Sequence, residues 1–130
     1  MEPLQLADCL LLITDDDMIN RVVLKHMLKD CGMQMEEATD GSECLELIQK
    51  SKAKRIVLLL DLNMPIMDGY EVIEHMKNDP AKFDHVRTLV ISASLQSQFA
   101  KSGLSEYIMD YIEKPVDKER LLSKVIECTI

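Results

Sequence analysis

Residues 56–71 read Ile-Val-Leu-Leu-Leu-Asp-Leu-Asn-Met-Pro-Ile-Met-Asp-Gly-Tyr-Glu and contain a complete strand–loop–helix signal. The run before Asp61 is entirely apolar, which predicts a short strand buried on both faces of a sheet. Asp68 and Glu71 have the spacing of a capping box, which predicts that a helix begins directly after the loop. A buried strand followed by a helix is the repeating unit of α/β proteins with a parallel sheet.

The same alternation continues along the rest of the chain. Further strands are predicted at Cys9–Thr14, Met33–Ala38, Thr88–Ser92 and within Tyr107–Ile112. Helices between them have predicted buried stripes at Ile19, Val22, Val23 and Met27, at Cys44, Leu45, Leu47 and Ile48, at Val72, Ile73 and Met76, and at Leu121, Leu122, Val125 and Ile126. The segment Gln96–Gly103 is a poor helix candidate. We therefore expect one α/β domain over residues 1–130, with its core at about 9–127, folded as a doubly wound three-layer sandwich.

The composition limits the class of protein. The 130 residues include 15 basic and 23 acidic ones, a formal net charge of −8, and no basic stripe. Direct nucleic-acid binding is not expected, because neutralising phosphates needs clustered Lys and Arg. No apolar run approaches the roughly 20 residues of a membrane span, and residues 1–5 show no secretory signal, so we expect no membrane insertion and a cytoplasmic location. The four separated cysteines lack zinc-site spacing and are expected to be reduced.

Polar side chains gather where the predicted strands end. The ends of four strands carry, in chain order, Asp15-Asp16-Asp17, Asp61, Ser92 and Lys114-Pro115. If the strand order is 2-1-3-4-5, these strands are neighbours and their ends share one crevice. Crowded carboxylates are costly unless a cation joins them, and a set of oxygen ligands favours Mg²⁺ or Mn²⁺. A lysine and a hydroxyl beside such a site suit a phosphoryl group, and a carboxylate can be the nucleophile that forms an aspartyl phosphate.

Taken singly, each of these residues has an ordinary explanation, and only their joint placement is informative. Asp17 is expected to cap the first helix rather than bind a cation. An EF-hand loop starting at Asp61 fails, because Pro65 takes its fifth position and Val72 the twelfth, where an acid is required. A P-loop or flavin-phosphate site would need a loop rich in glycine or hydroxyl residues, whereas the loop after the first strand is acidic.

These motifs resemble the receiver domain of two-component response regulators, and the resemblance extends from about Leu10 to Val125. The matching segments are Leu-Leu-Ile-Thr-Asp15-Asp16-Asp17-Met-Ile-Asn20-Arg21, Leu-Leu-Asp61-Leu-Asn-Met-Pro65-Ile-Met-Asp68-Gly69-Tyr-Glu, Ser92-Ala93 and Asp110-Tyr111-Ile-Glu-Lys114-Pro115. These sequence motifs are close to those of the receiver domains of hybrid sensor histidine kinases. The resemblance implies a CheY-like, flavodoxin-like (βα)5 sandwich with a parallel five-stranded sheet of order 2-1-3-4-5. Glu106-Tyr107 depart from the small residues usual before the last strand, so the fourth helix is expected to be short, shifted or mobile.

The resemblance also implies a role for each acidic residue. Asp61 would accept the phosphoryl group. Asp16 would bind Mg²⁺ directly, Asp15 would hold it through water, and the backbone carbonyl of Asn63 would complete the protein ligands, with Mn²⁺ as a possible substitute.

The remaining implied roles form a switch. Ser92 would donate a hydrogen bond to a phosphoryl oxygen, and Tyr111 would turn inward into the space that Ser92 vacates. Lys114 would bridge to Asp61 or its phosphate, and the Lys114–Pro115 bond is expected to be cis. Because the contact from Ser92 would exist only in the phosphorylated form, it would bias a two-state loop.

The expected function is a phospho-accepting receiver in a phosphorelay, a signalling module that catalyses only its own phosphorylation and dephosphorylation. The expected partners are a sensor histidine kinase or a histidine phosphotransfer protein as donor, and an effector on the face formed by the fourth helix, last strand and fifth helix. Two alternatives stay open. One is a phosphorylation-independent scaffold, and the other is an aspartyl-nucleophile phosphatase, which would usually carry a second aspartate where Asn63 stands. Whether the domain acts alone or within a longer protein is open.

Overall fold

The computed structural model describes residues 5–130; residues 1–4, part of the segment predicted to lack a secretory signal, lie outside it. The strands are β1 (Cys9–Thr14), β2 (Gln34–Ala38), β3 (Arg55–Leu60), β4 (Val86–Ser92) and β5 (Asp110–Glu113). The helices are α1 (Met18–Met27), α2 (Gly41–Lys50), α3 (Gly69–Asn78), α4 (Gln96–Ala100) and α5 (Lys118–Cys128), with 3-10 turns at Leu6–Asp8 and Ser105–Tyr107. Among the described residues, no helix is both long and apolar enough to cross a bilayer.

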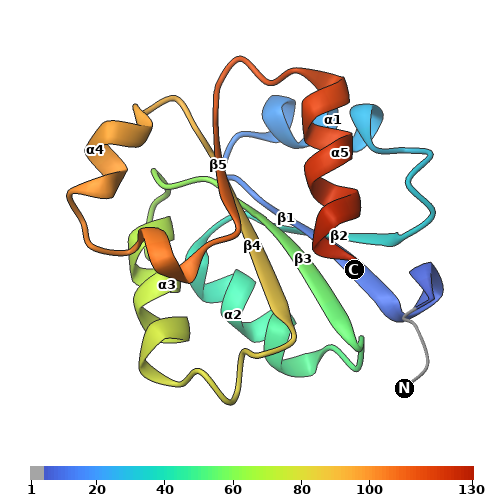
Figure 1. Cartoon of the computed structure of the whole chain (residues 1–130), viewed down its shortest axis with the longest axis horizontal. Coiled ribbons are helices and arrows are strands. Elements are labelled where there is room, and N and C mark those ends of the chain that lie inside the picture. Colours follow the sequence, from blue (N-terminus) through green and yellow to red (C-terminus); the bar gives the residue numbers. More distant parts are fainter. Residues whose placement is uncertain (1–4) are drawn as a thin grey trace.

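The five strands form one parallel sheet in the order β2-β1-β3-β4-β5, so the predicted strand order and fold class are confirmed (Figure 1). Helices α1 and α5 cover one face of the sheet, and α2, α3 and α4 cover the other. Residues of β1 alternate between the two cores: Leu11 packs on the side of α1 and α5, and Leu12 packs on the opposite side. This double covering explains why β1 is buried along its whole length.

Aspartates begin four of the helices. Asp17, Asp40, Asp68 and Asp117 each accept a hydrogen bond from a backbone N–H in the first turn of α1, α2, α3 and α5. These bonds satisfy amides that have no partner within the helix. The predicted helix starts are therefore confirmed, and so is the prediction that Asp17 caps α1.

The predicted buried stripe of α1 is wrong for three of its four residues. Ile19 is 69% exposed, and Val22 and Val23 are also exposed; of the predicted stripe only Met27 packs against the core, beside the buried Leu24 and Leu28. Apolar residues lie on both the exposed and the buried side of α1, so hydrophobic spacing alone could not identify the inward side.

The C-terminal half differs from the prediction in detail. Helix α4 has only five residues, in agreement with the weak helical signal of its segment. Strand β5 begins inside the predicted segment, at Asp110, and extends one residue beyond it to Glu113, whereas Tyr107 lies in a 3-10 turn. In α5, Leu121, Val125 and Cys128 are buried, whereas Ile126 is half exposed.

Candidate phosphoacceptor site

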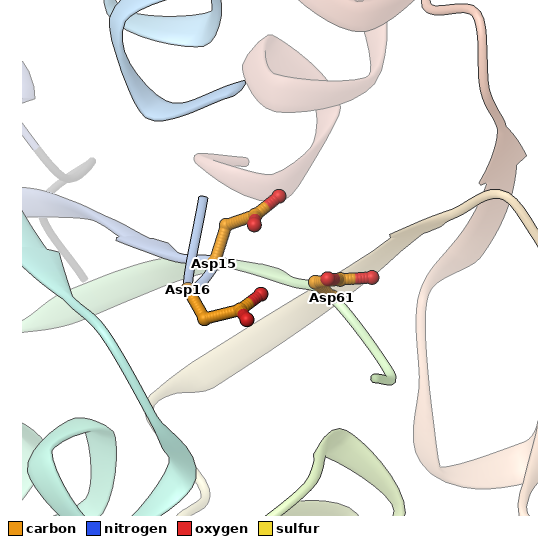
Figure 2. A group of neighbouring side chains, drawn as sticks. All are labelled: Asp15, Asp16 and Asp61. Carbon is orange, nitrogen blue, oxygen red and sulfur yellow. The ribbon is translucent and has the colours of Figure 1, made fainter. Parts of the chain in front are cut away.

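Three carboxylates meet at the carboxyl ends of β1 and β3. Asp61 directly follows β3, and its N–H donates to the Thr14 carbonyl (3.0 Å), which sets it beside the Asp15–Asp16 turn that follows β1. One carboxylate oxygen from each of Asp15, Asp16 and Asp61 lies within 4.8 Å of the others. Figure 2 shows the three side chains directed into one space. The predicted juxtaposition therefore exists.

Asp61 differs from an ordinary surface carboxylate. Its residue is only 8% exposed. Burial raises the pKa of Asp61 to about 6; the Lys114 charge lowers it, Asp15 raises it, and backbone N–H bonds from Asn63 and Leu62 lower it. The Lys114 charge offsets the burial of Asp61 only in part, because the pKa stays raised, and an added cation would supply further positive charge.

Lys114 bonds to a different carboxylate from the one predicted. Its Nζ lies 3.2 Å from Oδ2 of Asp15, and this ion pair is partly buried. Its charge also acts on Asp61, but no Lys114–Asp61 hydrogen bond forms among the described residues. The Lys114–Pro115 bond is cis, as predicted.

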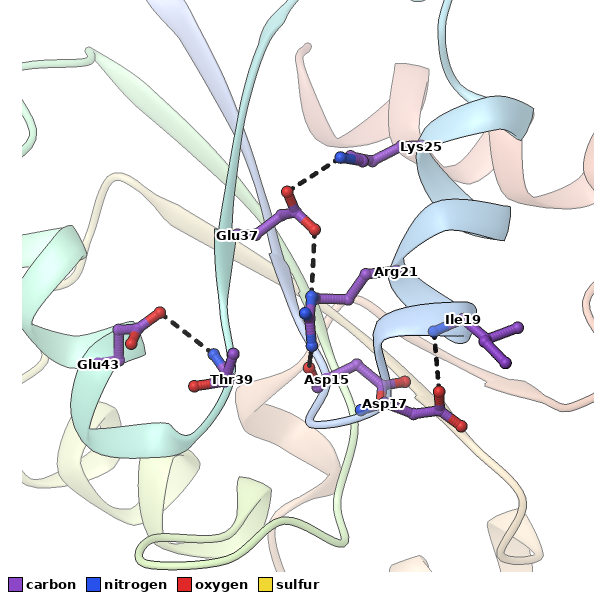
Figure 3. Close-up of polar contacts among 8 residues, drawn as sticks. All are labelled: Asp15, Asp17, Ile19, Arg21, Lys25, Glu37, Thr39 and Glu43. Carbon is purple, nitrogen blue, oxygen red and sulfur yellow. Dashed lines mark hydrogen bonds and ion pairs between the residues drawn. The ribbon is translucent and has the colours of Figure 1, made fainter.

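The Asp15–Asp17 turn is held by contacts that the sequence did not indicate. The Asp17 N–H donates to Oδ1 of Asp15 (2.9 Å). Arg21 of α1 donates from Nη1 to the Asp15 carbonyl (2.7 Å) and from Nε to Oε1 of Glu37 in β2 (3.1 Å) (Figure 3). In the sequence, Arg21 stands out only as part of the family motif. The signal that could reveal its role is a charged residue on the inward side of an amphipathic helix.

The loop after Asp61 is closely packed and leads directly into α3. Gly69 begins α3 against the acceptor, and a Cβ at this position would overlap the Asp61 carbonyl oxygen. Ile66 has φ +68° in a turn closed by the Met67 N–H and the Pro65 carbonyl (2.7 Å), and its side chain is 82% exposed. A β-branched residue rarely adopts this conformation, so the loop carries local strain.

Ser92 and Tyr111 lie on the other side of the site. Ser92 is fully buried at the end of β4, and its Oγ accepts a hydrogen bond from the Ser94 N–H (3.1 Å). Tyr111 lies inward, 1% exposed, with its hydroxyl donating to the Ser94 carbonyl (2.7 Å) and its ring centroid 5.3 Å from that of Phe99. The structure shows Tyr111 in its inward position. The predicted inward movement of Tyr111 upon phosphorylation stays a prediction.

The chemistry of these donors fits a hard divalent cation. Carboxylate oxygens are the ligands that Mg²⁺ and Mn²⁺ accept, and no His or Cys joins the group among residues 5–130. Asn63, whose backbone carbonyl was predicted as a further ligand, follows Asp61 by two residues, and its backbone N–H lowers the pKa of Asp61. Its carbonyl role stays a prediction.

Comparison with known proteins identifies the family. The sequence profile described as the response regulator receiver domain matches residues 11–126. The chain belongs to this family. A similar solved structure is the CheY-like receiver domain protein from Methanospirillum hungatei JF-1, with 30% identity, a TM-score of 0.74, and coverage of 93% of this chain and 94% of that one. Chemotaxis protein CheY4 of Vibrio cholerae is 26% identical, with a TM-score of 0.78, and the match covers 92% of this chain and 98% of CheY4.

Sequence relatives of this receiver domain differ widely in length. It is 32% identical over 120 residues to the uncharacterized 14.6 kDa protein in the sodA1 3′ region of Leptolyngbya boryana, covering 92% of this chain and 89% of that protein. It is 28% identical to the sensor histidine kinase CheAY of Helicobacter pylori, over 92% of this chain but 15% of the kinase. It is 33% identical to the response regulator MprA of a Mycobacterium species, over 88% of this chain and 48% of that regulator. The chain is thus a module of two-component systems, and it spans only part of the kinase and the regulator.

Proposed function

We propose that this receiver domain accepts a phosphoryl group on Asp61 from a phosphohistidine donor, in a reaction that depends on Mg²⁺. The observation that carries the proposal is the buried Asp61 carboxylate, which lies with Asp15 and Asp16 at one strand edge. In the transfer, a carboxylate oxygen of Asp61 forms a bond to phosphorus, and the bond from phosphorus to the imidazole nitrogen breaks. The electron pair of the broken bond returns to the imidazole.

The residues around Asp61 have separate tasks in this reaction. Asp15, Asp16 and Asp61 would hold Mg²⁺, with the Asn63 carbonyl as a further ligand, and the bound ion would offset negative charge on the phosphoryl oxygens. The phosphoryl group would carry about −1.5 to −2 charges in place of the single charge of the Asp61 carboxylate, and the Lys114 ammonium would partly neutralise them from its position beside Asp15. The Ser92 hydroxyl would exchange its contact with the Ser94 N–H for one with a phosphoryl oxygen.

Intact-mass spectrometry after incubation with acetyl phosphate tests the proposal. We expect one added phosphoryl group, which requires Mg²⁺ and disappears in Asp61→Asn. Asp17→Asn is the matched control, because Asp17 lies in the same turn but caps α1, and its labelling should persist. If wild type and Asp61→Asn are labelled equally, the acceptor assignment is wrong.

The same experiment separates the two alternatives. A scaffold that works without phosphate would bind Mg²⁺ and stay unlabelled. An aspartyl phosphatase would turn over a generic phosphate ester many times; Asn63, two residues after Asp61, offers no carboxyl group to act as its acid and base. We therefore propose a signalling module rather than a turnover enzyme.

The exposed side of α1 supports a place for the donor. Ile19, Val22 and Val23 are exposed on the helix that begins directly after the acidic turn. A cavity of about 270 Å³ lies between α1 and the Lys114–Val116 segment and is lined by Val23 and Met27. The phosphohistidine must approach Asp61 from this end of the sheet, so an apolar surface on the donor can pack here during transfer. Val22→Glu should slow phosphotransfer from a histidine donor without slowing labelling by acetyl phosphate; equal rates with the histidine donor would contradict this docking.

We further propose that an effector binds the face formed by α4, β5 and α5, as the family resemblance implies. Exposed apolar side chains on the connection from β4 to β5 support this, namely Leu95, Tyr107 and Met109. Amide chemical-shift changes upon phosphorylation should therefore extend from Ser92 to α4 and β5; changes confined to the acidic site would argue against this face. A cytoplasmic location and the absence of direct nucleic-acid binding, which agrees with the net charge of −8, complete the proposal.

A further inference from the structure

Arg21 links three elements around the acidic turn. Its side chain is 12% exposed and extends from α1 to Glu37 on β2, with Nε 3.1 Å from Oε1. Its Nη1 donates to the backbone carbonyl of Asp15, at 2.7 Å. Figure 3 shows the guanidinium between the two acceptors. The rigid fork of a guanidinium suits this task, because it directs two donors along fixed directions.

The carbonyl that Arg21 holds belongs to the peptide bond between Asp15 and Asp16. Because a peptide unit is planar, restraining this oxygen also restrains the N and Cα atoms of Asp16, the atoms from which its side chain leaves the backbone. The Asp16 carboxylate lies within 4.8 Å of those of Asp15 and Asp61. Like charges at this separation repel, and Asp16 is exposed, so an unrestrained turn would move it away from the other two.

Glu37 holds the guanidinium in place. It accepts from Lys25 (3.0 Å) as well as from Arg21. Hydrogen bonds from Lys25, and then from Arg21, lower the pKa of Glu37 against the effect of burial, so its charge persists at neutral pH. Lys25 lies one helical turn after Arg21 and shares this acceptor, but its Nζ makes no hydrogen bond to the Asp15 turn among the described residues.

We propose that Arg21, seated by Glu37, is a positioning residue that presets the Asp15–Asp16 turn for a divalent cation. The inference rests on the proposed cation-dependent function of the acidic site. It assigns to Arg21 a part in cation affinity and not in the phosphoryl transfer itself. Groups that orient metal ligands from behind typically change affinity by about 10- to 100-fold when removed.

Mn²⁺ binding by electron paramagnetic resonance, with Mg²⁺ as a competitor and no phosphodonor present, tests the proposal. We expect Arg21→Met to weaken Mn²⁺ binding by about 10- to 100-fold. Arg21→Lys, which keeps one charged donor, should recover part of the loss. Lys25→Met is the matched control: it removes the other cation from Glu37 on the same helix and should leave Mn²⁺ affinity unchanged. At saturating Mg²⁺, Arg21→Met should be labelled by acetyl phosphate at close to the wild-type rate.

Two results would overturn the proposal. One is wild-type Mn²⁺ affinity in Arg21→Met, and the other is an equal loss in Arg21→Met and Lys25→Met, which would mean that only the ion pairing between α1 and β2 matters. Urea unfolding without metal checks that each variant folds. If Arg21→Met does not fold, Glu37→Gln replaces it, and unchanged Mn²⁺ affinity in that variant would count against the proposal. A wild-type protein that binds Mn²⁺ but is never labelled would refute the proposed function while leaving this inference intact.

Discussion

Replacing Asp61 with asparagine is expected to stabilise the metal-free domain at neutral pH, although it removes the proposed acceptor. Burial raises the pKa of Asp61 from 3.8 to about 6, with Lys114 opposing the shift and Asp15 adding to it. The folded state therefore holds the Asp61 proton more tightly than the unfolded state does. The difference between these pKa values corresponds to about 3 kcal/mol of destabilisation once the carboxyl group is ionised.

The sign of the effect fixes the pH range in which it appears. Well below the ordinary pKa of 3.8, Asp61 is protonated in both states, and its raised pKa has no influence on the free energy of unfolding. Between the ordinary pKa and the folded pKa of about 6, wild type loses stability relative to Asp61→Asn as the pH rises. Above the folded pKa, the full difference in the free energy of unfolding persists.

Urea unfolding of both proteins in EDTA, at about pH 4 and about pH 7.5, measures this difference. Asp117→Asn is the control, because asparagine caps a helix about as well as aspartate and Asp117 faces solvent at the start of α5. It should change little at either pH. If Asp61→Asn differs from wild type by the same free energy at both pH values, burial of a charged Asp61 carboxylate is not a source of instability and the reasoning fails.

Three further changes test other parts of the site. Mg²⁺ should raise the melting temperature of wild type more than that of Asp16→Asn, since the variant lacks one carboxylate ligand; equal shifts in a thermal melt would remove Asp16 from the cation site. Gly69→Ala should lower the melting temperature and slow labelling by acetyl phosphate, because a Cβ would overlap the Asp61 carbonyl oxygen; wild-type values for both would show that α3 can move away freely. Tyr111→Phe should cost about 0.5–1.5 kcal/mol in urea unfolding, because the partly buried hydrogen bond from its hydroxyl to the Ser94 carbonyl is lost, and an unchanged unfolding curve would contradict that bond.

Local sequence signals predicted the parts of the fold that depend on local chemistry. The apolar run before Asp61 could only be covered on both faces, and the aspartates that begin α2 and α3 are placed where their carboxylates reach the first-turn amides. The positions of the acidic residues at strand ends, combined with a parallel sheet, were enough to predict that Asp15 and Asp61 meet.

Features that depend on tertiary packing could not be predicted in this way. The spacing of Val22 and Val23 would be the same on a helix face that packs against a core and on one that faces solvent, and the side of α1 that is buried follows from how the helix packs on the sheet. The bond from Arg21 to the Asp15 carbonyl depends on how α1 lies across β1 and β2. Lys114 could reach either of two neighbouring carboxylates, and its pairing with Asp15 reflects side-chain geometry that no spacing encodes.

The ion pair between Lys114 and Asp15 joins residues that are 99 positions apart in the chain. A chain emerging from the ribosome exposes Asp15 and Asp61 long before β5 has been synthesised. Closing so long a loop is entropically costly, so the complete site assembles only when the last strand has docked onto β4. A chain that ends before β5 can already bring Asp15 and Asp61 together through the pairing of β1 with β3, but it lacks the ammonium group that pairs with Asp15, so the charge balance of the site is completed last.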